Sequence, residues 1–152
     1  MPSVPRMFRL RAPALRRWAN LVNLSTPAGL ALARLTGCRI RTGPQGVVLA
    51  GGYPLALPKA AAFTLGNVIL YRSSSARRIT ADGSPLLRHE MRHSTQYAIL
   101  GPLFLPLYFA SAAASRLLAG NPASANPFER LAGLADGGYR QAGRGHSRSR
   151  QG

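Results

Sequence analysis

The sequence has little cysteine and few acidic residues. Its 152 residues include one cysteine, Cys38, which excludes an internal disulfide framework and a cysteine-based metal cluster. Only 4 Asp and Glu stand against 20 Lys and Arg, for a formal net charge of +16. This balance favours anionic neighbours, membrane or nucleic acid, through non-specific, salt-sensitive contacts of the arginine-rich ends. We expect a cytoplasmic protein, either free or peripheral to a membrane.

Long uninterrupted apolar runs are also missing. After the arginines of residues 6–17, Pro13 and Asn20 break the apolar pattern, so we expect no cleaved signal peptide. Residues 97–115 carry no charge over roughly the length of a bilayer span, but Gly101-Pro102 interrupts them. We predict two helices that meet at this Gly-Pro break, the second buried in the core.

The length suits one domain with one core. We predict a single domain over residues 1–138, in which residues 1–12 are a flexible basic arm. Residues 139–152, YRQAGRGHSRSRQG, are nearly free of apolar side chains and are predicted to be a disordered basic tail.

Helical spacing precedes the central part of the chain. In residues 13–22, Leu15, Trp18 and Val22 share one helical face, which predicts a short amphipathic helix with Trp18 as a core anchor. Thr26-Pro27 then predicts the start of a second helix, which ends at Gly37.

Short apolar segments follow and predict strands. They are separated by turn signals, and Gly66-Asn67 is either a bulge or a tight turn. The segments are residues 38–41 (CRIR), 46–50 (GVVLA), 53–57 (YPLAL) and 62–72 (AFTLGNVILYR). We predict an α+β fold with a small, mostly antiparallel sheet of three or four strands. Residues 72–83 are a predicted polar loop.

Ser84-Pro85 predicts a helix that runs to about Leu100 and carries the sequence His-Glu-Met-Arg-His. His89 and His93 are four residues apart, so both imidazoles lie on one helical face and can bind one ion. Glu90 follows the first histidine, as in the H-E-x-x-H arrangement. There, the two histidines hold Zn²⁺ and the glutamate takes a proton from water. The alternative is a polar helix surface, which Arg88 and Arg92 favour.

A catalytic zinc site needs a third protein ligand. His146 lies in the predicted tail, and Asp82 and Asp136 stand near predicted helix ends. Glu129, in Asn-Pro-Phe-Glu-Arg, is the remaining candidate. Since Asn126 and Glu129 also fit a capping box, the residues alone leave both roles open.

HEMRHSTQ, then GPLFLPLYF and NPFER, resembles the pattern of small bacterial zincin-like proteins, with HExxHxxQ on one helix and a glutamate on a later one. HEMRHSTQ is also similar to the signature of the metallopeptidase-like domain of contractile-injection-associated proteins. The resemblance covers about residues 24–132 and is strongest over 86–130. It implies a minimal zincin-like fold, with the HExxH helix packed on the sheet among further helices.

The resemblance implies a gluzincin-type site, with His89, His93 and Glu129 as zinc ligands and Glu90 as general base. It implies a zinc metallopeptidase that cleaves a peptide or protein substrate, which pairs with the strand in residues 62–71. Gln96 is a candidate second-shell partner, with a packing role as its alternative. Arg92 departs from the family pattern, which prefers an apolar residue there, and no motif marks an oxyanion-stabilising residue.

Tyr97, four residues after His93, is a second-shell candidate as a hydroxyl donor, although core packing is the simpler role. The aromatic and leucine residues after the Gly-Pro break are predicted to form the core wall behind the active helix. They are Phe104, Leu105, Tyr108 and Phe109, with Phe128 packed against them. The alternative functions are a basic protein that binds RNA or an anionic membrane surface, and a non-catalytic module stabilised by zinc.

Overall fold

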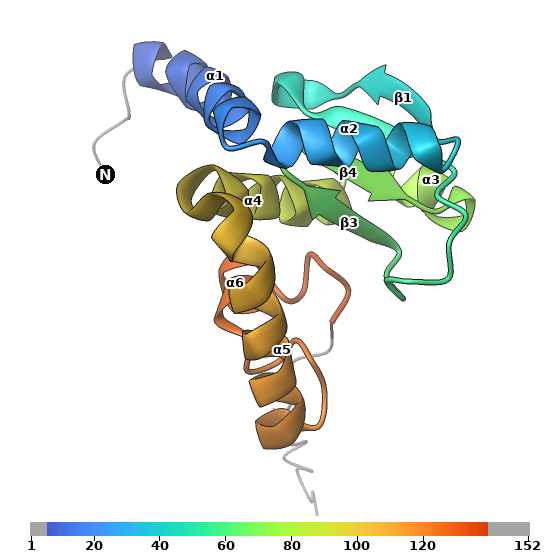
Figure 1. The fold of residues 1–152 in the computed structure, drawn as a ribbon, viewed down its shortest axis with the longest axis vertical. Helices are drawn as coiled ribbons and strands as arrows, with labels where there is room; N and C mark the ends of the chain where they lie inside the picture. Colours follow the sequence, from blue (N-terminus) through green and yellow to red (C-terminus); the bar gives the residue numbers. More distant parts are fainter. Residues whose placement is uncertain (1–5, 140–152) are drawn as a thin grey trace, which may run out of the picture.

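The computed structural model describes residues 6–139, with side chains from residue 12 onward. Its helices and four-stranded sheet confirm the predicted small α+β fold (Figure 1). The α-helices are α1 (Arg6–Val22), α2 (Ser25–Leu35), α3 (Ala76–Thr80), α4 (Pro85–Leu100), α5 (Phe104–Ala119) and α6 (Pro127–Ala132). The strands are β1 (Arg39–Thr42), β2 (Val48–Gly51), β3 (Ala62–Leu65) and β4 (Val68–Tyr71). Short 3-10 turns are η1 (Pro44–Gly46), η2 (Ser73–Ser75) and η3 (Gly101–Leu103).

The sheet has the strand order β1-β2-β4-β3. It is mostly antiparallel, as predicted, because only β2 and β4 run parallel. Gly66 has φ 64° in the tight turn between β3 and β4, and a Cβ there would lie 2.4 Å from the backbone of Ser25. The turn therefore packs directly against the start of α2, and only glycine fits it.

Two local predictions differ from the structure. Residues 53–57 do not form a strand, because Pro54 and the following Pro58 have no N–H to donate to a sheet. The predicted loop over residues 72–83 contains the short helix α3.

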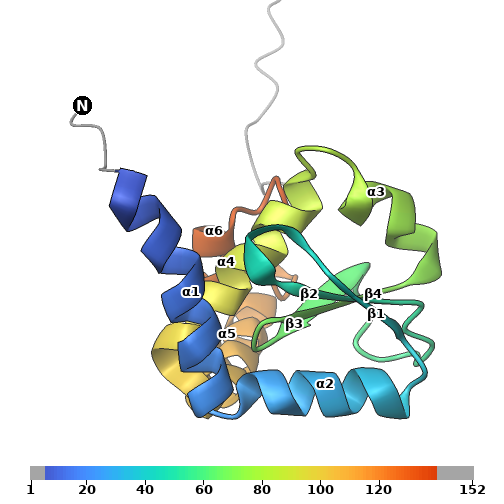
Figure 2. The ribbon, with the colours of Figure 1, turned by 90° about the horizontal axis from the view of Figure 1, so that it is seen from above.

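The sheet lies between helices on its two faces. Ile69 and Leu49 on one face pack with Ile79 of α3 and Leu86 of α4. On the other face, residues of β2 and β4 pack with Ala33 of α2. Figures 1 and 2 both show α2 on one side of the sheet and α4 on the other. This packing holds α4 against the sheet, next to the edge strand β3.

Helix α1 is longer than predicted. It is helical from Arg6 onward, so the predicted flexible arm over residues 1–12 is wrong for residues 6–12, and residues 1–5 lie outside the described part. The physical reason is that arginine, leucine and methionine favour helix.

The predicted faces of α1 are reversed. Trp18 is 66% exposed and is not a core anchor, whereas Arg16 and Asn20 are buried. The Arg16 guanidinium donates to the Gln45 carbonyl (2.9 Å), and the Asn20 amide donates to the Ser94 carbonyl (2.9 Å). These hydrogen bonds give the buried donor groups of Arg16 and Asn20 their partners, although Asn20 Oδ1 has none among the described residues, and they turn the apolar side chains outward.

Helices α4 and α5 meet at Gly101-Pro102, as predicted. The second helix is not buried, however, because only Phe104 and Ser115 of α5 are inaccessible. Figure 1 shows α5 running away from the sheet. The helical segment Pro85–Ala119 is long and apolar enough to cross a membrane, with a mean hydropathy of 1.5 over its most apolar window. Length and composition alone are weak evidence, since core helices of soluble proteins pass the same criteria.

Candidate metal centre

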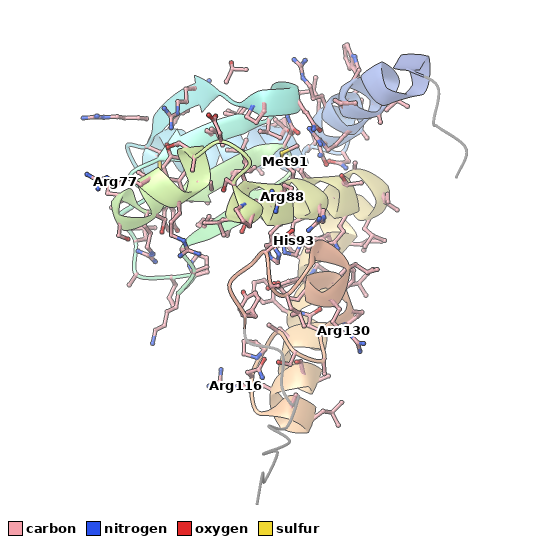
Figure 3. All side chains as sticks on the ribbon, turned by 180° about the vertical axis from the view of Figure 1, so that it is seen from behind. Arg77, Arg88, Met91, His93, Arg116 and Arg130 are labelled. Atoms are coloured by element: carbon pink, nitrogen blue, oxygen red, sulfur yellow. The ribbon has the colours of Figure 1, made fainter. Side chains whose placement is uncertain are left out.

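Helix α4 begins and ends where the sequence predicts. The Ser84 hydroxyl accepts a hydrogen bond from the Leu87 amide (3.0 Å), Pro85 occupies the first turn, and Gly101 with φ 57° ends the helix. This start places His89 and His93 in successive turns on the buried side of α4. Figure 3 shows His93 on the side of α4 that faces α6.

His89, His93 and Glu129 come together in a buried group that could hold a metal ion. Their ligand atoms all lie within 4.8 Å of one another. The two Nε2 atoms are 3.1 Å apart, and the Glu129 oxygens lie 3.1 Å from His89 Nε2 and 3.6 Å from His93 Nε2. Ligands about 2.0–2.1 Å from a tetrahedral zinc ion lie about 3.3 Å apart, so this spacing fits such an ion.

The other ring nitrogens fix how the imidazoles face the centre. His89 Nδ1 donates to the Gly133 carbonyl (3.0 Å), and His93 Nδ1 donates to Gln96 Oε1 (2.8 Å). Because both acceptors are oxygens that carry no hydrogen, each Nδ1 carries the proton. With the proton on Nδ1, each ring in its neutral form presents the lone pair of Nε2 to the centre, the arrangement that metal-binding histidines show.

One buried atom has no hydrogen-bond partner in this arrangement. Glu129 Oε2 lies 3.1 Å from His89 Nε2 but has no hydrogen-bond partner among the described residues. Two lone pairs and a carboxylate oxygen thus converge with no donor between them. Such a group requires a cation, either a proton or a metal ion.

The pKa shifts of His89 and Glu129 also favour a cation at the centre. Burial disfavours the charged form of His89, but Glu129 and Glu90 outweigh it and raise the pKa of His89. Burial would raise the pKa of Glu129, but His89 and His93 outweigh it and hold that pKa well below its usual range. The electrostatics of the site therefore favour an added positive charge.

Glu129 reaches the centre from α6. The Asn126 side chain accepts from the Phe128 amide (3.0 Å) and caps the helix without help from Glu129. The Glu129 carboxylate instead faces the histidines and accepts a hydrogen bond from the Tyr108 hydroxyl. The sequence left open whether Glu129 caps α6 or binds a metal ion, and its carboxylate has the position of a metal ligand.

Glu90 lies beside the centre and is buried. The Thr64 hydroxyl of β3 donates to Glu90 Oε2 (2.7 Å) and so orients the carboxylate. Burial raises the pKa of Glu90, although His93 and Thr64 oppose the shift. A carboxylate with a raised pKa can hold and release a proton closer to neutral pH.

Gln96 and Tyr97 have different surroundings. Gln96 accepts from His93 and donates to the Phe128 carbonyl (2.9 Å), so it connects a centre histidine to α6. The Tyr97 ring is 1% exposed and lies 4.3 Å from the Phe104 ring, which is a core position.

The segment after α6 lies against the centre. Asp136 accepts from Arg92 (2.7 Å) and Arg88 (3.3 Å), which attaches the segment to α4. A Cβ on Gly137 would lie 2.6 Å from His89 Cε1, so the backbone passes directly over the imidazole. Tyr139, placed in the disordered tail by the prediction, has its ring 6.1 Å from the ring of His89. Arg92, which departs from the family pattern, thus helps to position this segment.

The centre opens into a cavity of about 140 Å³ between α4, α5 and β3. Its apolar wall is formed mainly by Pro58, Ala60, Ala62, Phe63, Phe104, Leu105 and Phe109. Phe104 and Phe128 pack together as predicted, with ring centroids 5.3 Å apart. Phe109 is 62% exposed, so the predicted core wall is only partly buried, because one side of α5 has no covering element among the described residues.

Three residues that contact the centre or its neighbours are not among the predicted site residues: Thr64, Tyr108 and Tyr139. Tyr139 had one available signal, as an aromatic residue next to Gly137-Gly138. Asp82 is exposed, and His146 lies outside the described residues.

The chain is similar to the eCIS core domain family over residues 33–99. This match covers less than half of the chain and includes His89, Glu90 and His93, but neither α5 nor α6. It gives no evidence for a zincin or HExxH metallopeptidase family, so the implied peptidase activity is a proposal. No curated protein and no solved structure matches the chain.

Proposed function

We propose that the protein is a zinc-dependent peptidase in which His89, His93 and Glu129 hold zinc and Glu90 is the general base. The observation that carries this proposal is the buried centre itself. Two Nε2 lone pairs 3.1 Å apart face a buried carboxylate oxygen that has no hydrogen-bond donor. Two histidines and a glutamate are a ligand set of catalytic zinc, with a fourth position for water.

The residues around the centre have the chemistry that hydrolysis needs. When bound, zinc supplies a Lewis acid that acidifies water and polarises the carbonyl under attack. Glu90, oriented by Thr64, takes the proton of the attacking water and passes it to the leaving amine. The raised pKa of Glu90 suits both transfers.

A peptide or protein segment is the substrate that the fold favours. β3 is at the edge of the sheet and lines the cavity through Ala62, Phe63 and Thr64. An extended peptide can add to this edge by backbone hydrogen bonds, which places its carbonyl groups near α4. The apolar wall of the cavity favours an apolar side chain beside the cleaved bond.

The Glu90→Gln variant tests the proposal. It keeps a side chain of the same size, so we expect unchanged zinc content by mass spectrometry. Cleavage of a mixed peptide library should fall by about 10²–10⁴-fold, the usual contribution of a general base. Asp82→Asn, at an exposed carboxylate, is the matched control. Wild type without zinc after purification free of chelators, or equal cleavage by Glu90→Gln, would contradict the proposal.

A zinc-stabilised module without catalysis is the second candidate. It is favoured by the way the centre connects separate elements, since Glu129 comes from α6 and His89 also contacts Gly133. In this case zinc raises the melting temperature, and wild type and Glu90→Gln are equally inactive on the library.

A further inference from the structure

Helix α1 presents its apolar side chains to the outside. Leu15, Trp18 and Val22 are 68%, 66% and 76% exposed, and their spacing places them on one stripe. The polar residues Arg16 and Asn20 are buried on the opposite side. A helix exposed only to water normally shows the reverse pattern.

Helix α5 is apolar on nearly all sides. Leu107 is 45% exposed, Leu117 is 88% exposed, and Leu103, just before the helix, is 65% exposed. These residues follow one helical stripe away from the buried Phe104 and Ser115. An all-apolar helix usually lies inside a core or in a membrane.

The two apolar helices are neighbours at one corner of the molecule. The Asn23 amide, just after α1, donates to the Tyr97 carbonyl of α4 (2.9 Å). A Cβ on Gly101, at the turn into α5, would lie 3.4 Å from Asn23 Cβ. Figures 1 and 2 both show the end of α1 beside this turn.

The charge along these helices and their surroundings has one sign. Residues 6–22 and 99–119 contain no Asp or Glu. Arg17 on α1, Arg116 on α5 and Arg130 on α6 are exposed. Figure 3 labels Arg116 and Arg130 in the part of the molecule formed by α5 and α6. Apolar surface bordered by arginine and free of carboxylates is complementary to a layer of anionic lipid.

We propose that α1 and α5 dock the protein on the surface of an anionic lipid bilayer. The exposed leucines and Val22 enter the boundary between headgroups and acyl chains, and Trp18 lies at headgroup level, where tryptophan is enriched. The arginines bind lipid phosphates while their stems cover apolar surface. The segment Pro85–Ala119 lies on the bilayer and does not span it, because its first half contains the buried groups His89, Glu90 and His93.

Trp18 is the only tryptophan of the chain and is therefore a native reporter. Vesicles of phosphatidylcholine with phosphatidylglycerol should shift its emission to shorter wavelength, and brominated acyl chains should quench it. Vesicles of phosphatidylcholine alone should change it much less. Emission that stays that of a water-exposed indole at saturating anionic lipid would overturn the proposal.

Vesicle co-sedimentation tests the two helices separately. We expect the double variants Leu15→Ser with Val22→Ser, and Leu103→Ser with Leu107→Ser, each to weaken binding at least about tenfold, given the apolar area removed. Leu35→Ser, at the 87% exposed end of α2, is the matched control and should bind as wild type does. Equal binding by all variants would contradict the proposal.

Other partners would give different results. A nucleic-acid protein would bind RNA with strong salt dependence, and neither double variant would change its affinity for vesicles. Self-association through the same surface would appear as a dimer that vesicles do not dissociate. Both results overturn the proposal. Glu129→Ala should bind vesicles as wild type does, so failure of the metal centre and failure of lipid docking are distinguishable.

Discussion

The two halves of the helical segment Pro85–Ala119 distribute their side chains in opposite ways. In α4, His89, Glu90 and His93 are at most 6% exposed. In α5, Leu107 and Phe109 are 45% and 62% exposed. Globular proteins usually bury apolar side chains and expose charged ones, so each half departs from the common pattern in its own direction.

Each helix has surroundings that are incomplete among the described residues: the buried charged groups of α4 lack a cation, and the apolar surface of α5 lacks a covering partner. Buried charged groups are costly unless they are paired, and Glu129 Oε2 has no donor. A large exposed apolar surface marks a contact with another molecule. We therefore expect α4 to be completed by a cation and α5 by lipid.

Phe104 and Phe109 compare a buried and an exposed side chain within α5. Phe104 is 4% exposed and packs on Tyr97, so Phe104→Ala should lower the free energy of unfolding by about 3–5 kcal/mol. Phe109→Ala should change it by less than about 1 kcal/mol, because the side chain already faces solvent. Urea denaturation measures both. Similar losses would mean that α5 is covered by protein.

Glu129→Ala tests the metal centre that α4 forms with α6. Loss of this carboxylate should weaken zinc binding by more than about 100-fold, since even outer-shell changes cost 10–100-fold. Competition with a chromophoric chelator measures the affinity. Asp82→Ala is the control and should bind zinc as wild type does. If Glu129→Ala kept the wild-type affinity, Glu129 would not be a ligand.

The sequence predicted the parts of the site that depend on local spacing. His89 and His93 are four apart on a helix whose start is marked by Ser84-Pro85, so their common face follows from helical geometry. The position of Glu129 could not be derived this way, because it depends on how α6 packs on α4. The resemblance supplied that residue, and Asn126 alone caps its helix.

The misplaced residues share a physical cause. In α1, periodicity identified two faces, but the buried one was decided by tertiary hydrogen bonds of Arg16 and Asn20. Tyr139 was placed in the tail because its neighbours are polar. Its position beside His89 depends on the Asp136 contacts with Arg88 and Arg92, which no local pattern reveals.

Tyr108→Phe tests the place where the two helices meet, because Tyr108 belongs to α5 but donates to Glu129. Loss of this hydrogen bond should lower zinc affinity about tenfold, as for other outer-shell partners of metal ligands. Tyr139→Phe removes a hydroxyl from the same cavity without a bond to Glu129 and is the matched control. Equal affinities for the two variants would show that the Tyr108 hydroxyl does not support the ligand.

Asp136→Asn should have the smallest effect, because its partners Arg88 and Arg92 are on the exposed side of α4. Hydrogen bonds from Arg92, then Arg88, lower the pKa of Asp136 below its ordinary 3.8. A lowered carboxyl pKa stabilises the fold above that ordinary value and ceases to do so as the pH falls through the lowered pKa. At neutral pH we expect faster amide exchange at Gly137 and Tyr139 with little change in melting temperature, since surface ion pairs contribute little. Unchanged exchange would mean that packing on His89, and not the arginines of α4, holds the segment.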